Sequence, residues 1–126
     1  CPRVAADAAS AEGEGHGIAS PRPITGLNEA ILRHLSEGLR RVVADPAGTG
    51  HATIHDGAIS VAGKTGTAET RPGSPAHAWF AGYLPAEKPR YVIVVALEHA
   101  GDAATAAGPV VKRLANVLYD NRHVSN

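Results

Sequence analysis

The sequence predicts an α+β fold in which a three-stranded antiparallel sheet packs against one helix before it and one helix after it. Three observations give this prediction. Apolar residues recur about every four positions between residues 27 and 43, which is typical of an amphipathic helix. Three short strand-like runs, separated by turns, follow between residues 59 and 98. A second apolar helical pattern comes after Gly101.

Length and composition fit one domain and exclude some kinds of partner. The 126 residues include twelve basic and twelve acidic side chains with no basic run, so no nucleic-acid partner is predicted. One tryptophan, one phenylalanine and three tyrosines leave most of the core to alanine and valine. The one cysteine, Cys1, cannot form an internal disulfide. No apolar run approaches the roughly 20 residues that span a bilayer.

Residues 1–24 are rich in alanine, glycine and acidic side chains and are expected to be a flexible arm before a domain at 25–126. Thr25 or Asn28 is suited to cap the first helix, and Asp45-Pro46 is expected to end it, because the residue before a proline avoids helical geometry. The apolar stripe of this helix consists of Leu27, Ile31, Leu35, Leu39, Val42 and Val43.

Two histidines in the next segment, His51 and His55, would share one face of a helix and could then bind a metal ion. The segment is expected to be a loop or strand instead, because its neighbours are turn-forming residues, namely Gly48, Gly50, Asp56 and Gly57. No metal site is therefore predicted.

Residues 59–62 are predicted to form a strand that leads into Lys64-Thr65-Gly66-Thr67. Strand alternation places Thr65 and Thr67 on one face and Lys64 on the other. Glycines within a strand, here Gly63 and Gly66, often mark a bulge or the close approach of a ligand or another backbone. The pattern indicates a strand edge that could receive an extended peptide.

Residues 77–84 and 90–98 are predicted to be the next two strands, with turns at 69–76 and 85–89. The run from 91 to 97 is apolar without alternation, which predicts a strand covered on both faces. Trp79 has two open interpretations, a core aromatic or a residue lining a cleft beside Lys64. Pro109 is expected near the first turn of the final helix. That helix is expected to direct five apolar side chains towards the sheet, namely Val110, Val111, Leu114, Val117 and Leu118.

The segment Val61–Glu69, followed after a loop by His77–Tyr83 with the sequence His-Ala-Trp-Phe-Ala-Gly-Tyr, resembles the third and fourth strands of the transpeptidase domain of penicillin-binding proteins. Lys-Thr-Gly is a motif of these proteins and of class A β-lactamases. The helix ending in paired valines and the glycine-threonine loop after it are also similar to that family. The resemblance runs from about Leu27 to about Tyr119 and implies the C-terminal part of a transpeptidase domain.

The resemblance implies a peptidoglycan D,D-transpeptidase, which transfers the acyl group of D-alanyl-D-alanine peptides through a serine ester and binds β-lactams. It assigns catalytic roles to Lys64 and Thr67, and substrate binding to Lys64, Thr65, Gly66 and Thr67. The Thr67 N–H would donate to the oxyanion, and the two threonine hydroxyls would hold the substrate carboxylate. No cofactor and no metal are implied. The parent protein would be membrane-anchored and act in the cell envelope, outside the cytoplasmic membrane, in cell-wall synthesis and cell division.

The other two motifs of the family, Ser-x-x-Lys and Ser-x-Asn, cannot be written in this sequence. The residues three positions before the three lysines are Val61, Pro85 and Pro109. Tyr119-Asp120-Asn121 imitates a Tyr-x-Asn variant of the second motif but stands after the triplet, where the family has it before. We therefore expect the nucleophile on a missing N-terminal half or a companion polypeptide, and this chain alone to be inactive.

The strand at 90–98 would then leave a long apolar edge, which a companion polypeptide or a second copy of the chain would cover. Two alternatives stay open. One is a non-catalytic module that binds a peptide or a partner, and the other is a part of a serine β-lactamase.

Overall fold

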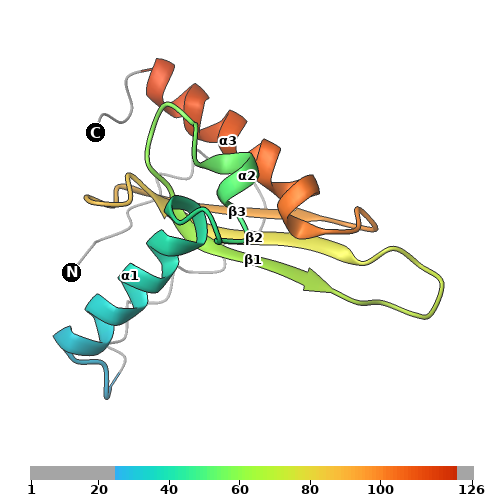
Figure 1. Cartoon of the computed structure of the whole chain (residues 1–126), viewed down its shortest axis with the longest axis horizontal. Coiled ribbons are helices and arrows are strands. Elements are labelled where there is room, and N and C mark those ends of the chain that lie inside the picture. Colours follow the sequence, from blue (N-terminus) through green and yellow to red (C-terminus); the bar gives the residue numbers. More distant parts are fainter. Residues whose placement is uncertain (1–24, 122–126) are drawn as a thin grey trace, which may run out of the picture.

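The computed structural model describes residues 25–121. The elements are α1 (Glu29–Ala44), α2 (His51–Ile54), β1 (Ala62–Ala68), β2 (His77–Leu84), β3 (Tyr91–Leu97) and α3 (Ala103–Asp120), as Figure 1 shows. The predicted arm at 1–24 lies outside the described residues. Three antiparallel strands combined with helices confirm the predicted α+β fold.

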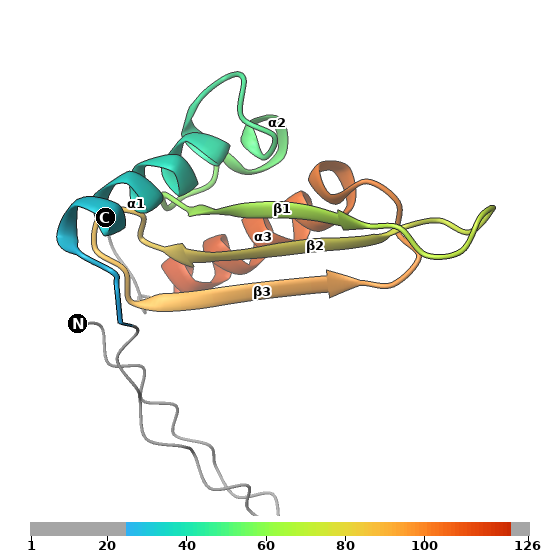
Figure 2. The same ribbon diagram turned by 90° about the horizontal axis from the view of Figure 1, so that it is seen from below.

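The sheet has the strand order β1-β2-β3, and both neighbouring pairs are antiparallel. Thr65 lies opposite Phe80, which lies opposite Val95, so these three side chains share one face. Lys64 lies on the other face, as strand alternation predicted. Figure 2 shows α3 behind the sheet, whereas α1 lies alongside the start of β1.

The face towards α3, called here the α3 face, is buried, and it includes Gly63, Thr65, Ala78, Phe80, Ile93 and Val95. The helix meets this face mainly through small side chains, Ala103, Ala107, Val111 and Ala115. Small residues let a helix backbone lie close to a sheet. The prediction that the final helix directs five apolar side chains towards the sheet was therefore largely wrong. Val111 is buried and Leu118 packs against the core, but three others are exposed, namely Val110, Leu114 and Val117.

The opposite face, called here the open face, is buried only at the start of β1, where Ala62 is covered, and its exposed residues in 25–121 include Lys64, Gly66, Trp79, Ala81, Val92 and Val94. The exposed fractions of Val92 and Val94 are 65% and 61%. The prediction that this strand is covered on both faces is thus wrong for residues 25–121. An apolar run indicates which faces are suited to burial, but it does not say whether the covering element belongs to the same chain.

Both long helices have side-chain caps. The Asn28 side chain accepts a hydrogen bond from the Ile31 N–H at 2.9 Å, which confirms Asn28 as the cap of α1. This helix ends at Ala44, and Asp45 is extended before the proline, as predicted. The Asp102 side chain caps α3 by accepting from the Thr105 N–H.

Pro109 lies inside α3 and not near its first turn, which corrects the prediction. Proline there leaves the carbonyl of Thr105, four residues earlier, without its helical donor. Both Thr105 and Pro109 are exposed, so water can hydrate this carbonyl. Because Asp102 caps the helix, α3 begins at Ala103, six residues before Pro109, and the proline lies beyond the first turn.

The prediction of a loop or strand after residue 50 is also wrong, because His51–Ile54 form one helical turn. The rings of His51 and His55 stack at 3.8 Å. Within the described part of the chain, no three His, Cys, Asp or Glu side chains gather as a metal site would need. In that same part, no helix combines the length and the apolar character that crossing a membrane requires.

Candidate functional site

Two facing glycines bring the first half of β1 close to β2. Gly63 lies opposite Gly82, and a Cβ atom on Gly63 would lie 2.4 Å from Cζ of the Phe80 ring. A Cβ atom on Gly82 would lie 2.3 Å from the Ala62 carbonyl oxygen. Of the two roles expected for Gly63, close approach of another backbone is therefore the one present.

Gly66 differs from Gly63, because it lies on the open face. The nearest atom to a Cβ placed there would be the Cβ of Trp79, at an ordinary 3.6 Å. Nothing within residues 25–121 therefore requires glycine at this position.

The backbone direction of β1 shows its free edge. The carbonyl oxygen of Ala62 points towards β2, because a Cβ on Gly82 would lie 2.3 Å from it, so strand alternation places the carbonyl of Thr65 on the side away from β2. The Thr65 carbonyl accepts a hydrogen bond from Nζ of Lys64 at 2.6 Å. In an antiparallel strand, the N–H and C=O of one residue point to the same side, and those of the next residue point to the other. The backbone groups of Thr67 therefore face the same free edge as those of Thr65.

The two threonine hydroxyls have partners on different elements. Thr65 is only 8% exposed, and its Oγ1 lies 2.7 Å from Oγ1 of Thr49 in the loop after α1. Thr67 is exposed, and its Oγ1 accepts from the N–H of Ala103, the first residue of α3, at 3.3 Å. Sequence analysis missed both partners. The glycine-threonine loop was a signal for the first, and nothing in the sequence singles out Ala103.

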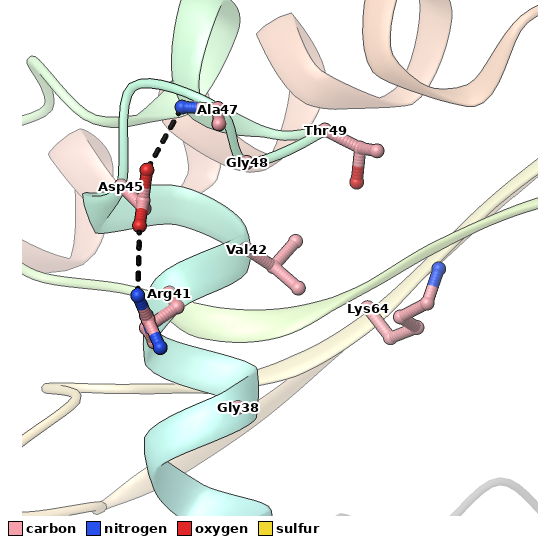
Figure 3. A pocket seen from close by; sticks show the side chains of 8 residues that line it. All are labelled: Gly38, Arg41, Val42, Asp45, Ala47, Gly48, Thr49 and Lys64. Atoms are coloured by element: carbon pink, nitrogen blue, oxygen red, sulfur yellow. Dashed lines mark hydrogen bonds and ion pairs between the residues drawn. The ribbon is translucent and has the colours of Figure 1, made fainter.

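An open cavity of about 330 Å³ lies between α1 and β1, where Figure 3 shows Lys64 across from the end of α1. Arg41 pairs with Asp45 at 3.3 Å on the helix side. The hydrogen bond from the Ala47 N–H, and then that from Arg41, hold the pKa of Asp45 below its ordinary value. The remaining lining residues are Gly38, Val42, Ala47, Gly48 and Thr49.

The positions of Trp79 and Asn121 decide two further interpretations of the sequence. Trp79 is 45% exposed on the open face, opposite Gly66 in the strand register, so the interpretation as a core aromatic is wrong. Asn121 donates from Nδ2 to the carbonyl of Val117, so in the Tyr-x-Asn-like segment this amide caps its own helix.

The sequence of residues 24–118 matches the family described as the penicillin-binding protein transpeptidase domain. The chain belongs to this family. The fold and the triplet on a free strand edge agree with the resemblance that the sequence predicted.

Three relatives give the extent of the match. The peptidoglycan D,D-transpeptidase MrdA of Haemophilus influenzae is 30% identical over 99 residues, covering 68% of this chain and 15% of the relative. A complex of penicillin-binding protein 2 with MreC from Helicobacter pylori matches with a TM-score of 0.69 and 31% identity, over 78% of this chain and 19% of that one. Penicillin-binding protein A of M. tuberculosis, as a penicillin G acyl-enzyme, gives a TM-score of 0.51 and 26% identity, over 71% and 20%. The chain thus spans less than a quarter of each of these three proteins.

Proposed function

We propose that this chain supplies the substrate-binding edge of a peptidoglycan D,D-transpeptidase, and that a segment outside residues 1–126 supplies the serine nucleophile. The observation that carries the proposal is the free edge of β1, on which Lys64, Thr65 and Thr67 lie together. A relative named a peptidoglycan D,D-transpeptidase and another captured as a penicillin G acyl-enzyme support the reaction class.

The substrate peptide would bind as an added strand along the free edge of β1. Main-chain groups of Thr65 and Thr67 face outward at alternate positions, as strand addition requires. The carbonyl of Thr65 accepts from Lys64 at present, and a peptide N–H would take over this acceptor. Lys64 would then be released to act in the cavity next to it.

The chemistry follows from the groups at this edge. Acyl transfer needs donors where the oxyanion develops, and the outward N–H of Thr67 is suited to this role. The hydroxyls of Thr65 and Thr67 would hold the substrate carboxylate, and the Lys64 ammonium would attract it and assist proton transfer. Gly66 keeps the approach to the strand free of side chains, since among residues 25–121 only the Cβ of Trp79 would contact a Cβ placed there.

The rest of the domain would cover apolar surfaces that are exposed in the described residues. The first is the apolar part of the open face, Trp79, Val92 and Val94. The second is the N-terminal half of α1 together with Leu27 just before it, where Ile31, Leu32 and Leu35 are the exposed helix residues. The third is the outer stripe of α3, with Val110, Leu114 and Val117. Surfaces of this kind are typical of protein contacts. We propose the missing part of the same transpeptidase domain, on the same or on a companion polypeptide, as the partner, and the outer side of the cytoplasmic membrane as the location.

The test begins with natively purified protein carrying these residues, prepared without denaturant and treated with a labelled β-lactam. Intact mass then identifies the acylated polypeptide, which we expect to be a segment outside residues 1–126. Replacing Lys64 by alanine should lower the acylation rate by roughly 100-fold, the range for a general acid or base. Lys88→Ala, at an exposed lysine in the turn after β2, is the matched control and should leave the rate unchanged.

Other outcomes select the alternatives. No acylation of any polypeptide would favour a non-catalytic module that binds a peptide or a partner. Continuous β-lactam turnover without a lasting adduct would favour a serine β-lactamase. An adduct within residues 1–126 would contradict the proposal that the nucleophile lies elsewhere.

A further inference from the structure

We infer that Thr49 is a positioning residue for the candidate site, acting through Thr65, an inference that rests on the proposed function. The two Oγ1 atoms are 2.7 Å apart, and either hydroxyl can be the donor. A hydroxyl has a single hydrogen to donate. If the Thr65 hydroxyl donates a hydrogen bond to a substrate carboxylate, the Thr49 hydroxyl must therefore be the donor in its hydrogen bond with Thr65. Binding of an anionic group therefore selects one direction for the chain of hydrogen bonds, from Thr49 to Thr65 to the carboxylate.

The loop that carries Thr49 is built against the end of α1. The last carbonyls of a helix lack helical donors and need other partners. The carbonyl of Val42 accepts from the Gly50 N–H at 2.9 Å, and that of Val43 accepts from Nδ1–H of His51 at 2.9 Å. The two residues after Thr49 thus cap α1, and before it the Gly48 N–H donates to the carbonyl of Asp45, so the backbone on both sides of Thr49 is held in place.

Gly48 completes this arrangement. A Cβ atom on Gly48 would lie 2.4 Å from the carbonyl oxygens of both Arg41 and Val42, a distance that side chains do not adopt. The backbone of the loop therefore packs directly on the helix end. Asp45 reinforces the turn by accepting from the Ala47 N–H at 2.9 Å.

The hydroxyl of Thr65, the other member of the pair, also lies in confined surroundings. Thr65 is 8% exposed, and among residues 25–121 its hydroxyl pairs with that of Thr49. Thr67, the second hydroxyl of the edge, depends instead on the Ala103 N–H. A change at Thr49 should therefore disturb one of the two hydroxyls and leave the other in place.

The test compares Thr49→Val, which keeps the shape and removes the hydroxyl, with Thr49→Ser, which keeps the hydroxyl. Each variant is made in the natively assembled protein and treated with penicillin G and, separately, with its methyl ester. For penicillin G we expect Thr49→Val to slow acylation about threefold to tenfold, the effect of one hydrogen bond. The ester has no carboxylate, so its rate should change less than twofold, and Thr49→Ser should restore the penicillin G rate.

Adding Thr65→Val gives a double-mutant cycle. If Thr49 acts through Thr65, Thr49→Val should have no further effect in the Thr65→Val background. Equal slowing of acid and ester, or an unchanged rate with both, would overturn the positioning role while leaving the proposed function intact. A wild type that neither compound acylates would refute the proposed function and this inference together. Circular dichroism of each variant verifies that the fold is kept.

Discussion

The two faces of the sheet have similar apolar side chains but different surroundings. On the α3 face, Phe80 and Val95 are almost completely buried under the helix. On the open face, their sequence neighbours Trp79 and Val94 remain 45% and 61% exposed. No helix among the described residues lies over β2 and β3 on that side (Figure 2). The α3 face holds the sheet and α3 together, and the open face is a surface suited to burial.

The difference also separates stability from function. Groups that hold the fold together, such as the Phe80 ring over Gly63, lie on the α3 face. Lys64 and Gly66 lie on the open face, beside the free edge where a substrate would bind. Substitutions in the core of the α3 face, such as at Phe80, should therefore affect unfolding, whereas those on the open face should affect binding. Thr65 and Thr67 lie on the α3 face but at the free edge of β1, so they are exceptions to this division.

The sharpest comparison uses two adjacent aromatic residues. Phe80→Ala should lower the free energy of unfolding by about 3–5 kcal/mol, because it leaves a cavity between the sheet and α3. Trp79→Ala should change it by about 0.5 kcal/mol or less, as at other surface sites. Urea unfolding followed by circular dichroism measures both, since Trp79 is the only tryptophan and its fluorescence is lost in one variant.

A large loss of stability in Trp79→Ala would contradict the assignment of this residue to an uncovered face. The same variant should weaken association with the rest of the domain, as measured by co-purification. Phe80→Leu, which keeps most of the buried volume, is the matched control for the core position.

Alanine substitutions at the two glycines of β1 should differ in their effect on stability in the same way, but by a smaller amount. Gly63→Ala should destabilise the protein by about 1–3 kcal/mol, because the new methyl group meets the Phe80 ring and the β2 backbone. Gly66→Ala meets only Trp79 Cβ at contact distance and should leave the melting temperature within a few degrees of wild type. It should instead slow β-lactam acylation, because a methyl group projects where the substrate strand approaches. Equal melting temperatures for the two variants would break the comparison.

Much of the fold could be predicted from the sequence because local signals agree with the tertiary structure. The periodic stripe of α1, the Asn28 cap and the Asp45-Pro46 ending all act within one helix. The three strands are separated by turns rich in proline and glycine, and strand alternation correctly separated Lys64 from Thr65. These features depend on neighbours in sequence.

The errors concern features that depend on distant residues. The apolar run of β3 did not reveal which of its faces α3 covers, and the valines of α3 were more conspicuous than the alanines that meet the sheet. Within the site, the triplet was evident from its motif. The glycine-threonine loop was a signal for Thr49, but its contact with Thr65, 16 positions later, depends on how the loop folds back on β1, which the sequence pattern does not give.

A smaller effect is expected from one charge placed on the open face. Val94→Lys should leave the free energy of unfolding within about 0.5 kcal/mol of wild type, because the side chain is largely in water. If the rest of the domain covers this face, the lysine should still abolish or strongly weaken co-purification. Val110→Lys, on the outer stripe of α3, tests separately whether that second proposed contact surface is covered. Undiminished co-purification of Val94→Lys would show that the open face stays exposed in the assembled protein.

The smallest effect concerns a charged cluster that joins α1 to the segment before β1 and to the turn after β2. The Ser60 hydroxyl donates to Glu87, and Arg40 lies 3.6 Å from the same carboxylate. The hydrogen bond from Ser60 is the main cause that lowers the pKa of Glu87. A carboxyl group whose pKa is lower in the folded state contributes stability above its unfolded pKa, near 4.5, and this contribution is lost as the pH falls through the folded value.

Glu87→Gln should therefore reduce stability at pH 7, and the difference from wild type should shrink as the pH falls through the lowered pKa of the folded carboxyl. The carboxylate is largely exposed, so the loss at pH 7 should stay below about 1 kcal/mol and shrink in high salt. Urea unfolding of both proteins between pH 3 and 7 measures the difference. A loss comparable to that of Phe80→Ala would mean that the charged cluster contributes as much to stability as packing on the α3 face does, which would contradict this expectation.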